Sequence, residues 1–142
     1  MAQITEFIGN HMGLFLAWVG LGIAMVVSEF GNRFRSFQEV SAQEAVQLMN
    51  KEDAMLVDIR AHGEFTDGHI TGAKHLLLSK VEAIAPMFKS HKEKPVIFYC
   101  KSGMTSQQAA SRLGKAEFTR IYSLKGGISG WISDQLPIEK GQ

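Results

Sequence analysis

Cysteine is nearly absent from this chain, whose only one is Cys100. A single cysteine cannot form a disulfide within the chain, and it cannot build a cysteine-based zinc site. Dithiol redox exchange within one chain is excluded as well, because no second thiol is present to resolve the disulfide. Two interpretations of Cys100 remain: a small buried residue at the end of a strand, or a reactive thiol.

A surplus of either charge is also lacking, since 15 Lys and Arg residues stand against 14 Asp and Glu residues. This balance gives no indication of binding to nucleic acid or to a strongly acidic partner. The sequence has no internal repeat and no low-complexity segment. Its 142 residues leave room for one domain of roughly 100 residues and an appendage, and not for two independent cores.

A long apolar run lies near the N-terminus, where every residue from 12 to 27 is apolar or glycine. The run extends over about 20 residues, enough to cross roughly 30 Å of hydrocarbon as a helix. We therefore predict a membrane anchor in residues 1–30, with the transmembrane helix at about 8–28. A cleaved signal peptide and a buried core helix are alternatives, but no basic leader precedes the run and its downstream flank is a poor cleavage site.

The basic residues around the run predict its orientation. Arg33 and Arg35 follow the run, and no Lys or Arg precedes it. Since basic residues favour the cytoplasmic side, we expect a single-pass protein with its N-terminus outside and its C-terminal domain in the cytoplasm.

Helical and strand patterns alternate through residues 37–142, after a predicted linker at 31–36. Ser41 and Glu44 have the spacing of a capping box and predict a short helix that ends at about Asn50. Strands are expected at 54–59, 74–77, 95–99 and 118–124, and further helices at 79–89, 106–113 and 128–134. Such alternation predicts an α/β fold with an open, mainly parallel sheet and helices on both of its faces.

Cys100 directly follows the predicted strand 95–99 and opens the loop CKSGMT. Open α/β sheets bind ligands at this place, where loop amides and a helix N-terminus favour an anion. Gly103 permits a tight backbone, Lys101 adds a cation, and Ser106 can cap the helix. A thiolate held in this way can attack a sulfane sulfur and keep the transferred atom as a persulfide.

Several motifs together resemble the single-domain rhodanese (thiosulfate sulfurtransferase) family across nearly all of residues 37–139. They are LVDIR (56–60), EF with GHITGAKHL (64–76), CKSGMT (100–105), and SLKGGISGW ending in LPIEK (123–140). The resemblance implies the rhodanese fold. With the apolar N-terminus, the chain is similar to a bacterial inner-membrane group of rhodanese-like proteins, which implies that location.

The resemblance also implies roles for individual residues. Cys100 is expected to be the persulfide nucleophile, in a cradle of amides from Lys101, Ser102, Gly103, Met104 and Thr105. Asp58 and Arg60 match a motif whose side chains usually brace that loop. Structural signature positions are matched by Gly68, His69, Gly126, Gly127 and Trp131. No metal and no cofactor is expected besides the covalent persulfide, and His69 is read as a structural residue.

Thr105 departs from the arginine that many family members carry at this place in the loop. A hydroxyl supplies no charge, so the binding of thiosulfate would rest on the amides, the helix and Lys101.

The expected partners are a small sulfane-sulfur donor or a protein persulfide, the membrane, and membrane proteins. A cysteine phosphatase is disfavoured because it needs a longer loop that ends in arginine. The main alternative is a non-enzymatic adaptor that recruits partners at the inner membrane.

Overall fold

The computed structural model describes residues 2–33, 36–83, 86, 93–115 and 118–141. The chain divides into two compact units, Met1–Arg35 and Ser36–Gln142.

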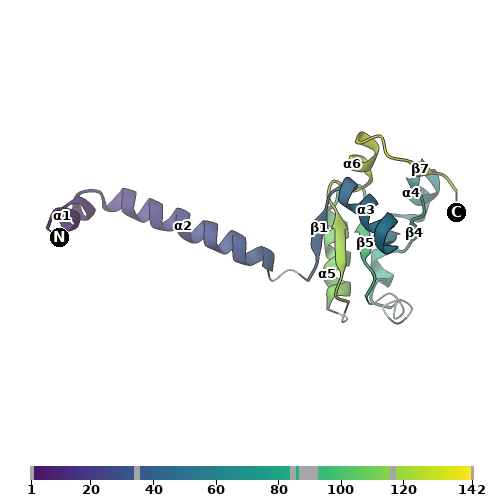
Figure 1. The fold of residues 1–142 in the computed structure, drawn as a ribbon, viewed down its shortest axis with the longest axis horizontal. Coiled ribbons are helices and arrows are strands. Elements are labelled where there is room, and N and C mark those ends of the chain that lie inside the picture. Colours follow the sequence, from purple (N-terminus) through teal and green to yellow (C-terminus); the bar gives the residue numbers. More distant parts are fainter. Residues whose placement is uncertain (1, 34–35, 84–85, 87–92, 116–117, 142) are drawn as a thin grey trace. The chain divides into compact units, whose positions relative to one another are not determined.

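The first unit contains the helices α1 (Ala2–Asn10) and α2 (Met12–Arg33), drawn at the purple end of Figure 1. Residues 12–30 of α2 have a mean hydropathy of 1.8, and this helix is long and apolar enough to span a membrane. The prediction of one helix from about residue 8 is wrong at its start, because a separate α1 ends at Asn10. Asn10 and His11 are the polar residues that interrupt the apolar run, and asparagine favours turns by bonding its own backbone.

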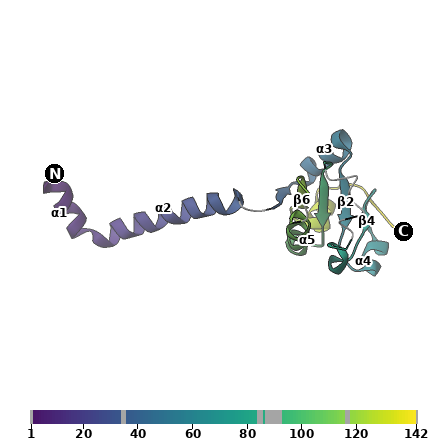
Figure 2. The same ribbon diagram turned by 90° about the horizontal axis from the view of Figure 1, so that it is seen from below.

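A five-stranded parallel sheet lies at the centre of the second unit, in the order β1-β6-β5-β2-β4 (Figures 1 and 2). Its strands are β1 (Gln38–Val40), β2 (Met55–Asp58), β4 (Lys74–His75), β5 (Val96–Tyr99) and β6 (Ile121–Leu124). Every residue of β2 and β5 is buried. Both strands are therefore continuous apolar runs in the sequence, apart from the terminal Asp58. The predicted α/β fold with a mainly parallel sheet is confirmed.

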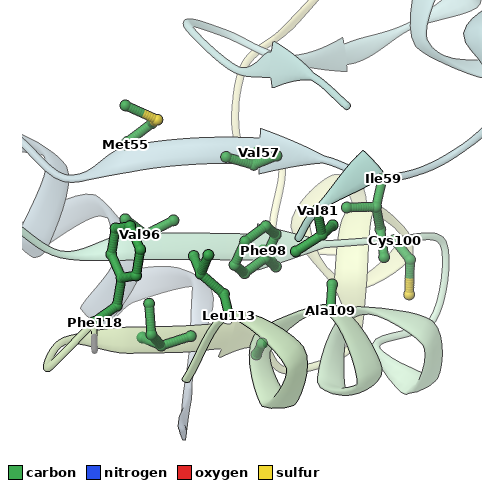
Figure 3. Close-up of a cluster of buried hydrophobic side chains, with 12 residues drawn as sticks. Met55, Val57, Ile59, Val81, Val96, Phe98, Cys100, Ala109, Leu113 and Phe118 are labelled. Carbon is green, nitrogen blue, oxygen red and sulfur yellow. The ribbon is translucent and has the colours of Figure 1, made fainter. Parts of the chain in front are cut away.

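Helices cover both faces of this sheet. They are α3 (Ala42–Glu52), α4 (His62–Asp67), α5 (Met104–Gly114), α6 (Gly127–Ser133) and the 3₁₀ helix η1 (Leu78–Lys80). Leu113 of α5 packs in the same cluster as Phe98 of β5 (Figure 3), whereas Trp131 of α6 packs with Ile97 on the other face. Because side chains alternate along a strand, Cys100 lies on the face of Phe98, toward α5.

A second, two-stranded sheet was not predicted. In it β3 (His69–Ile70) pairs antiparallel with β7 (Ile138–Glu139), in two segments for which the sequence predicted no strand. Strands of two residues carry no readable alternation, and these two lie far apart in the sequence. The short elements β1 and α4 were also missed, because three strand residues and six helical residues are too few to show a clear period.

The predicted helix boundaries were right in part. The capping box is confirmed, since the Glu44 amide donates to Ser41 Oγ (3.2 Å) and the Ser41 amide donates to Glu44 Oε2 (2.8 Å). The helix expected at 79–89 is wrong at its beginning, where η1 ends at Lys80 and residues 81–83 form a turn. Pro86, which lacks an amide hydrogen, opposes a regular helix there. Residues 84–85 and 87–92 of that expected helix lie outside the described residues.

Candidate active site

Cys100 lies immediately after β5, at the carboxyl edge of the parallel sheet, as Figure 3 shows. The loop that follows ends at Gly103, the N-cap of α5, whose φ of 99° is a left-handed conformation that favours glycine. A Cβ at Gly103 would lie 3.2 Å from the Gly126 nitrogen and 3.3 Å from the Leu124 oxygen. The loop is therefore both tightly turned and packed closely on the turn after β6.

The sulfur of Cys100 accepts a hydrogen bond from the Gly103 amide (3.1 Å), and only 5% of Cys100 is exposed. Burial raises the pKa of the thiol. Hydrogen bonds from the amide and hydroxyl of Ser106, and from the amides of Gly103 and Ser102, outweigh burial and bring the pKa below its ordinary value. The geometry thus favours a thiolate at this position.

Ser106 contributes to the site differently from what the sequence indicated. The expectation that Ser106 caps the helix is wrong, because α5 begins at Met104 and its N-cap is Gly103. Ser106 lies in the first turn, where its fully buried hydroxyl donates to the Gly103 carbonyl oxygen (3.0 Å) and lies 3.7 Å from the Cys100 sulfur. The Ser106 hydroxyl therefore contacts both the loop backbone and the sulfur from within the core.

The side chains of the remaining loop residues point into solvent. Lys101, Ser102, Met104 and Thr105 are all exposed, with 77% of Met104 accessible. Of the five residues expected to form the amide cradle, Ser102 and Gly103 provide amides that lower the pKa of the sulfur.

The start of α6 holds the other side of the loop. The Ile128 amide donates to the Cys100 carbonyl oxygen (2.9 Å), and the Ser129 amide donates to the Lys101 carbonyl oxygen (3.2 Å). Gly127 makes this approach possible, since its φ is 56° and a Cβ there would overlap the Cys100 oxygen and lie 2.7 Å from the Lys101 oxygen. The sequence marked Gly127 as a signature position but gave no signal for the two amides, which any residue type can supply.

Asp58, the last residue of β2, and Arg60 form a nearly buried ion pair. Arg60 Nη2 lies 2.6 Å from Asp58 Oδ2, and the side chains are 10% and 0% exposed. Arg60 also donates to the Gly68 carbonyl oxygen (2.7 Å). Among the described residues, neither side chain makes a hydrogen bond to the Cys100 loop, so the expected direct brace is wrong.

The ion pair instead acts next to Tyr99, the residue before Cys100. The Arg60 guanidinium lies 5.8 Å from the centre of the Tyr99 ring, and the Tyr99 hydroxyl accepts from the Ile70 amide (3.1 Å). Burial, and secondly the negative charge of Asp58, raise the pKa of Tyr99, so its hydroxyl stays neutral. This cluster anchors the end of β5, directly before Cys100.

His69 is fully engaged in the fold. Its Nδ1 bonds the Phe65 carbonyl oxygen (2.8 Å), its Nε2 bonds Glu139 Oε1 (3.1 Å), and its ring stacks on Phe65 at 3.8 Å. Within the described residues, no group of three or more His, Cys, Asp or Glu side chains could hold a metal ion.

A family model described as a rhodanese-like domain matches residues 41–134. The chain belongs to the rhodanese-like family. The resemblance noted from the sequence motifs is thereby confirmed, and Cys100 with its loop falls inside the matched rhodanese-like domain.

Relatives of the rhodanese-like chain extend this result. The uncharacterized protein YibN of Escherichia coli (strain K12) is 38% identical over 143 residues, covering 100% of both chains. Thiosulfate sulfurtransferase GlpE of Glaesserella parasuis serovar 5 (strain SH0165) is 38% identical over 106 residues, which are 75% of this chain and 96% of GlpE. A rhodanese-related protein from Thermoplasma volcanium has a solved structure that matches with a TM-score of 0.64 at 20% identity, covering 72% of this chain and 98% of that one. The family of this chain therefore includes sulfurtransferases.

Proposed function

We propose that this protein is a membrane-anchored sulfurtransferase or persulfide carrier that takes sulfane sulfur onto Cys100 and passes it to a thiophilic acceptor. The observation that carries the proposal is the hydrogen bond from the Gly103 amide to the Cys100 sulfur, in the loop that joins β5 to α5. An amide donor aimed at a buried sulfur stabilises an anion on that sulfur. GlpE, a relative that carries the name thiosulfate sulfurtransferase, supports the same reaction class.

The chemistry requires only the thiolate and a donor. The Cys100 thiolate attacks the outer sulfur of the donor, a sulfur–sulfur bond forms, and the bond to the leaving group breaks. The leaving group takes the electron pair, so thiosulfate releases sulfite and leaves a persulfide anion on Cys100. A nucleophilic acceptor then takes the outer sulfur and restores the thiolate. No cofactor is needed, because each step exchanges one sulfur bond for another.

The neighbouring charges bear on which donor is used. Lys101 is the exposed cation of the loop, whereas Thr105 supplies a hydroxyl where many family members carry arginine. Arg60 is held by Asp58 and the Gly68 carbonyl oxygen. A dianion such as thiosulfate therefore meets one loop cation plus amides, and we propose that a protein persulfide or a less charged donor loads Cys100 better.

Membrane attachment belongs to the proposal as well. Residues 12–30 are apolar enough for a span, and Arg33 and Arg35 follow them. We propose that α2 crosses the bacterial inner membrane with the N-terminus outside, which places Cys100 at the cytoplasmic face. There it would serve donors, acceptors and membrane proteins that come to the bilayer.

Sulfur loading of the purified full chain tests the function. The chain in mild detergent is incubated with thiosulfate, or separately with a glutathione persulfide, and analysed by intact-mass spectrometry. Cys100 should gain one sulfur atom and lose it to cyanide as thiocyanate, and Cys100→Ser should gain none. If no sulfane donor loads the chain, the proposed transferase is wrong and the adaptor function is favoured.

A further inference from the structure

Two buried hydroxyls lie behind Cys100. Ser106 of α5 and Ser123 of β6 are 0% and 1% exposed, and their Oγ atoms are 2.8 Å apart. Ser106 Oγ is also 3.0 Å from the Gly103 carbonyl oxygen and 3.7 Å from the Cys100 sulfur. Among the hydrogen bonds of the described residues, Ser123, which lies on the strand beside β5, reaches the sulfur through Ser106.

The hydroxyl of Ser106 has one hydrogen to donate but lies next to three hydrogen-bonding groups, which are the Cys100 sulfur, the Gly103 carbonyl oxygen and the Ser123 hydroxyl. It owns one hydrogen and two lone pairs, while the Gly103 carbonyl can only accept. With a neutral thiol, Cys100 donates to Ser106 and Ser106 donates to Gly103. Once the Cys100 sulfur is an anion, it can only accept hydrogen bonds. The Ser106 hydroxyl can then bond the sulfur only by donating its single hydrogen to it.

We propose that Ser123 is a positioning residue for Cys100: it donates its own hydrogen to Ser106, which leaves the Ser106 hydrogen free to turn from Gly103 to the anionic sulfur. The inference deepens the proposed function and rests on it, because thiolate and persulfide are the anions in question. A hydroxyl that accepts a hydrogen bond is also a stronger donor, so Ser123 strengthens the bond that Ser106 makes.

Among the described residues, charged side chains do not take over this role around the sulfur. Lys101 is exposed in the loop, and Asp58 and Arg60 are paired with each other at the end of β2. The hydrogen bonds that act on Cys100 come from neutral groups, namely three amides and the Ser106 hydroxyl. Removing one neutral donor from a buried sulfur should therefore be measurable in its titration.

The test measures the rate of Cys100 alkylation by iodoacetamide against pH, in the full chain in mild detergent. Cys100 is the only cysteine, so the rate reports its thiolate alone. Ser106→Ala should move the midpoint up by about one pH unit, which is the scale of one hydrogen bond to a charged group. Ser123→Ala should move it up by a smaller amount. The double variant should match Ser106→Ala alone, because Ser123 acts only through Ser106.

A matched control and an isosteric pair keep the result interpretable. Ser133→Ala removes an exposed hydroxyl that donates to the Ser129 carbonyl oxygen within α6, and it should leave the midpoint unchanged. If Ser123→Ala does not fold, Ser123→Thr and Ser123→Val replace it, since they share a shape and differ by the hydroxyl. The midpoint of Cys100 alkylation should then lie at a lower pH in Ser123→Thr than in Ser123→Val.

Two results would overturn the proposal: an unchanged midpoint in Ser123→Ala, or additive shifts in the double variant. Alkylation does not depend on sulfur transfer, so this outcome is separate from that of the loading assay. A chain that never accepts sulfur but shows the non-additive shifts would refute the proposed function and retain the hydroxyl pair as a thiolate-stabilising device.

Discussion

The amide of Ile128 donates to the carbonyl oxygen of Cys100 at 2.9 Å, which ties the start of α6 to the first residue of the active-site loop. This bond fixes the direction of the backbone that leaves β5. It depends on how closely the turn after β6 approaches the loop, and Gly127 determines that approach.

Gly127→Ala should destabilise the domain and abolish sulfur loading. The φ of 56° at this residue costs a side chain about 1 kcal/mol or more, and the added Cβ would overlap the Cys100 carbonyl oxygen. Gly130→Ala on the same helix is the matched control, since its Cβ would meet only the Lys125 oxygen at 3.6 Å. Urea unfolding followed by circular dichroism, together with the loading assay, should separate the two variants. Equal behaviour of both would contradict the role given to Gly127.

Asp58→Asn should lower the free energy of unfolding by about 3 kcal/mol, because it leaves the Arg60 guanidinium without its buried countercharge. The comparison is Lys94→Gln, which removes an ion pair whose side chains are 45% and 84% exposed. That exposed pair should contribute less than about 1 kcal/mol. Urea unfolding of the two variants measures the difference, and a similar small loss in both would show that the Asp58–Arg60 pair does not anchor the end of β5.

Stability should depend on pH through Cys100. Its pKa is lower in the folded chain than the ordinary value of about 8.5 for a free cysteine. The unfolded state therefore binds the proton more tightly, and the stabilisation from the thiolate is complete above the unfolded pKa and lost as pH falls through the folded pKa. Denaturant unfolding under reducing conditions should show a stability that rises with pH in this window. In Cys100→Ser this contribution should be missing, and an identical pH profile for both proteins would contradict the lowered pKa.

Leu21→Asp should weaken membrane attachment. Leu21 lies midway along the apolar window of α2, where a carboxylate costs about 3 kcal/mol on insertion scales. Extraction of membranes with alkaline carbonate should release a larger fraction of this variant than of Leu21→Ala, which keeps the position apolar. Release of the unchanged chain by carbonate would refute the transmembrane assignment altogether.

Much of the fold could be predicted from local patterns. The apolar runs of β2 and β5 and the capping box at Ser41 are contiguous features, so each is readable where it occurs. The strands β3 and β7 were not readable, because two residues show no alternation and their pairing closes a long loop. The start of α5 was placed too late, because the polar residues Ser102 and Thr105 on either side of Gly103 resemble a loop until this glycine is known to be the N-cap.

The sequence by itself determined the family and the apolar helix and indicated Cys100 as the candidate nucleophile, since a lone cysteine in a contiguous loop motif and a long hydrophobic run need no partner to be recognised. Only the tertiary structure decided what surrounds the sulfur. The order of the strands brings together segments that lie far apart in the chain. It places Ser123 beside Ser106, and the amides of Ile128 and Ser129 beside the Cys100 loop. Buried hydroxyls and backbone amides acquire a role only from those distances, and residue type alone does not encode them.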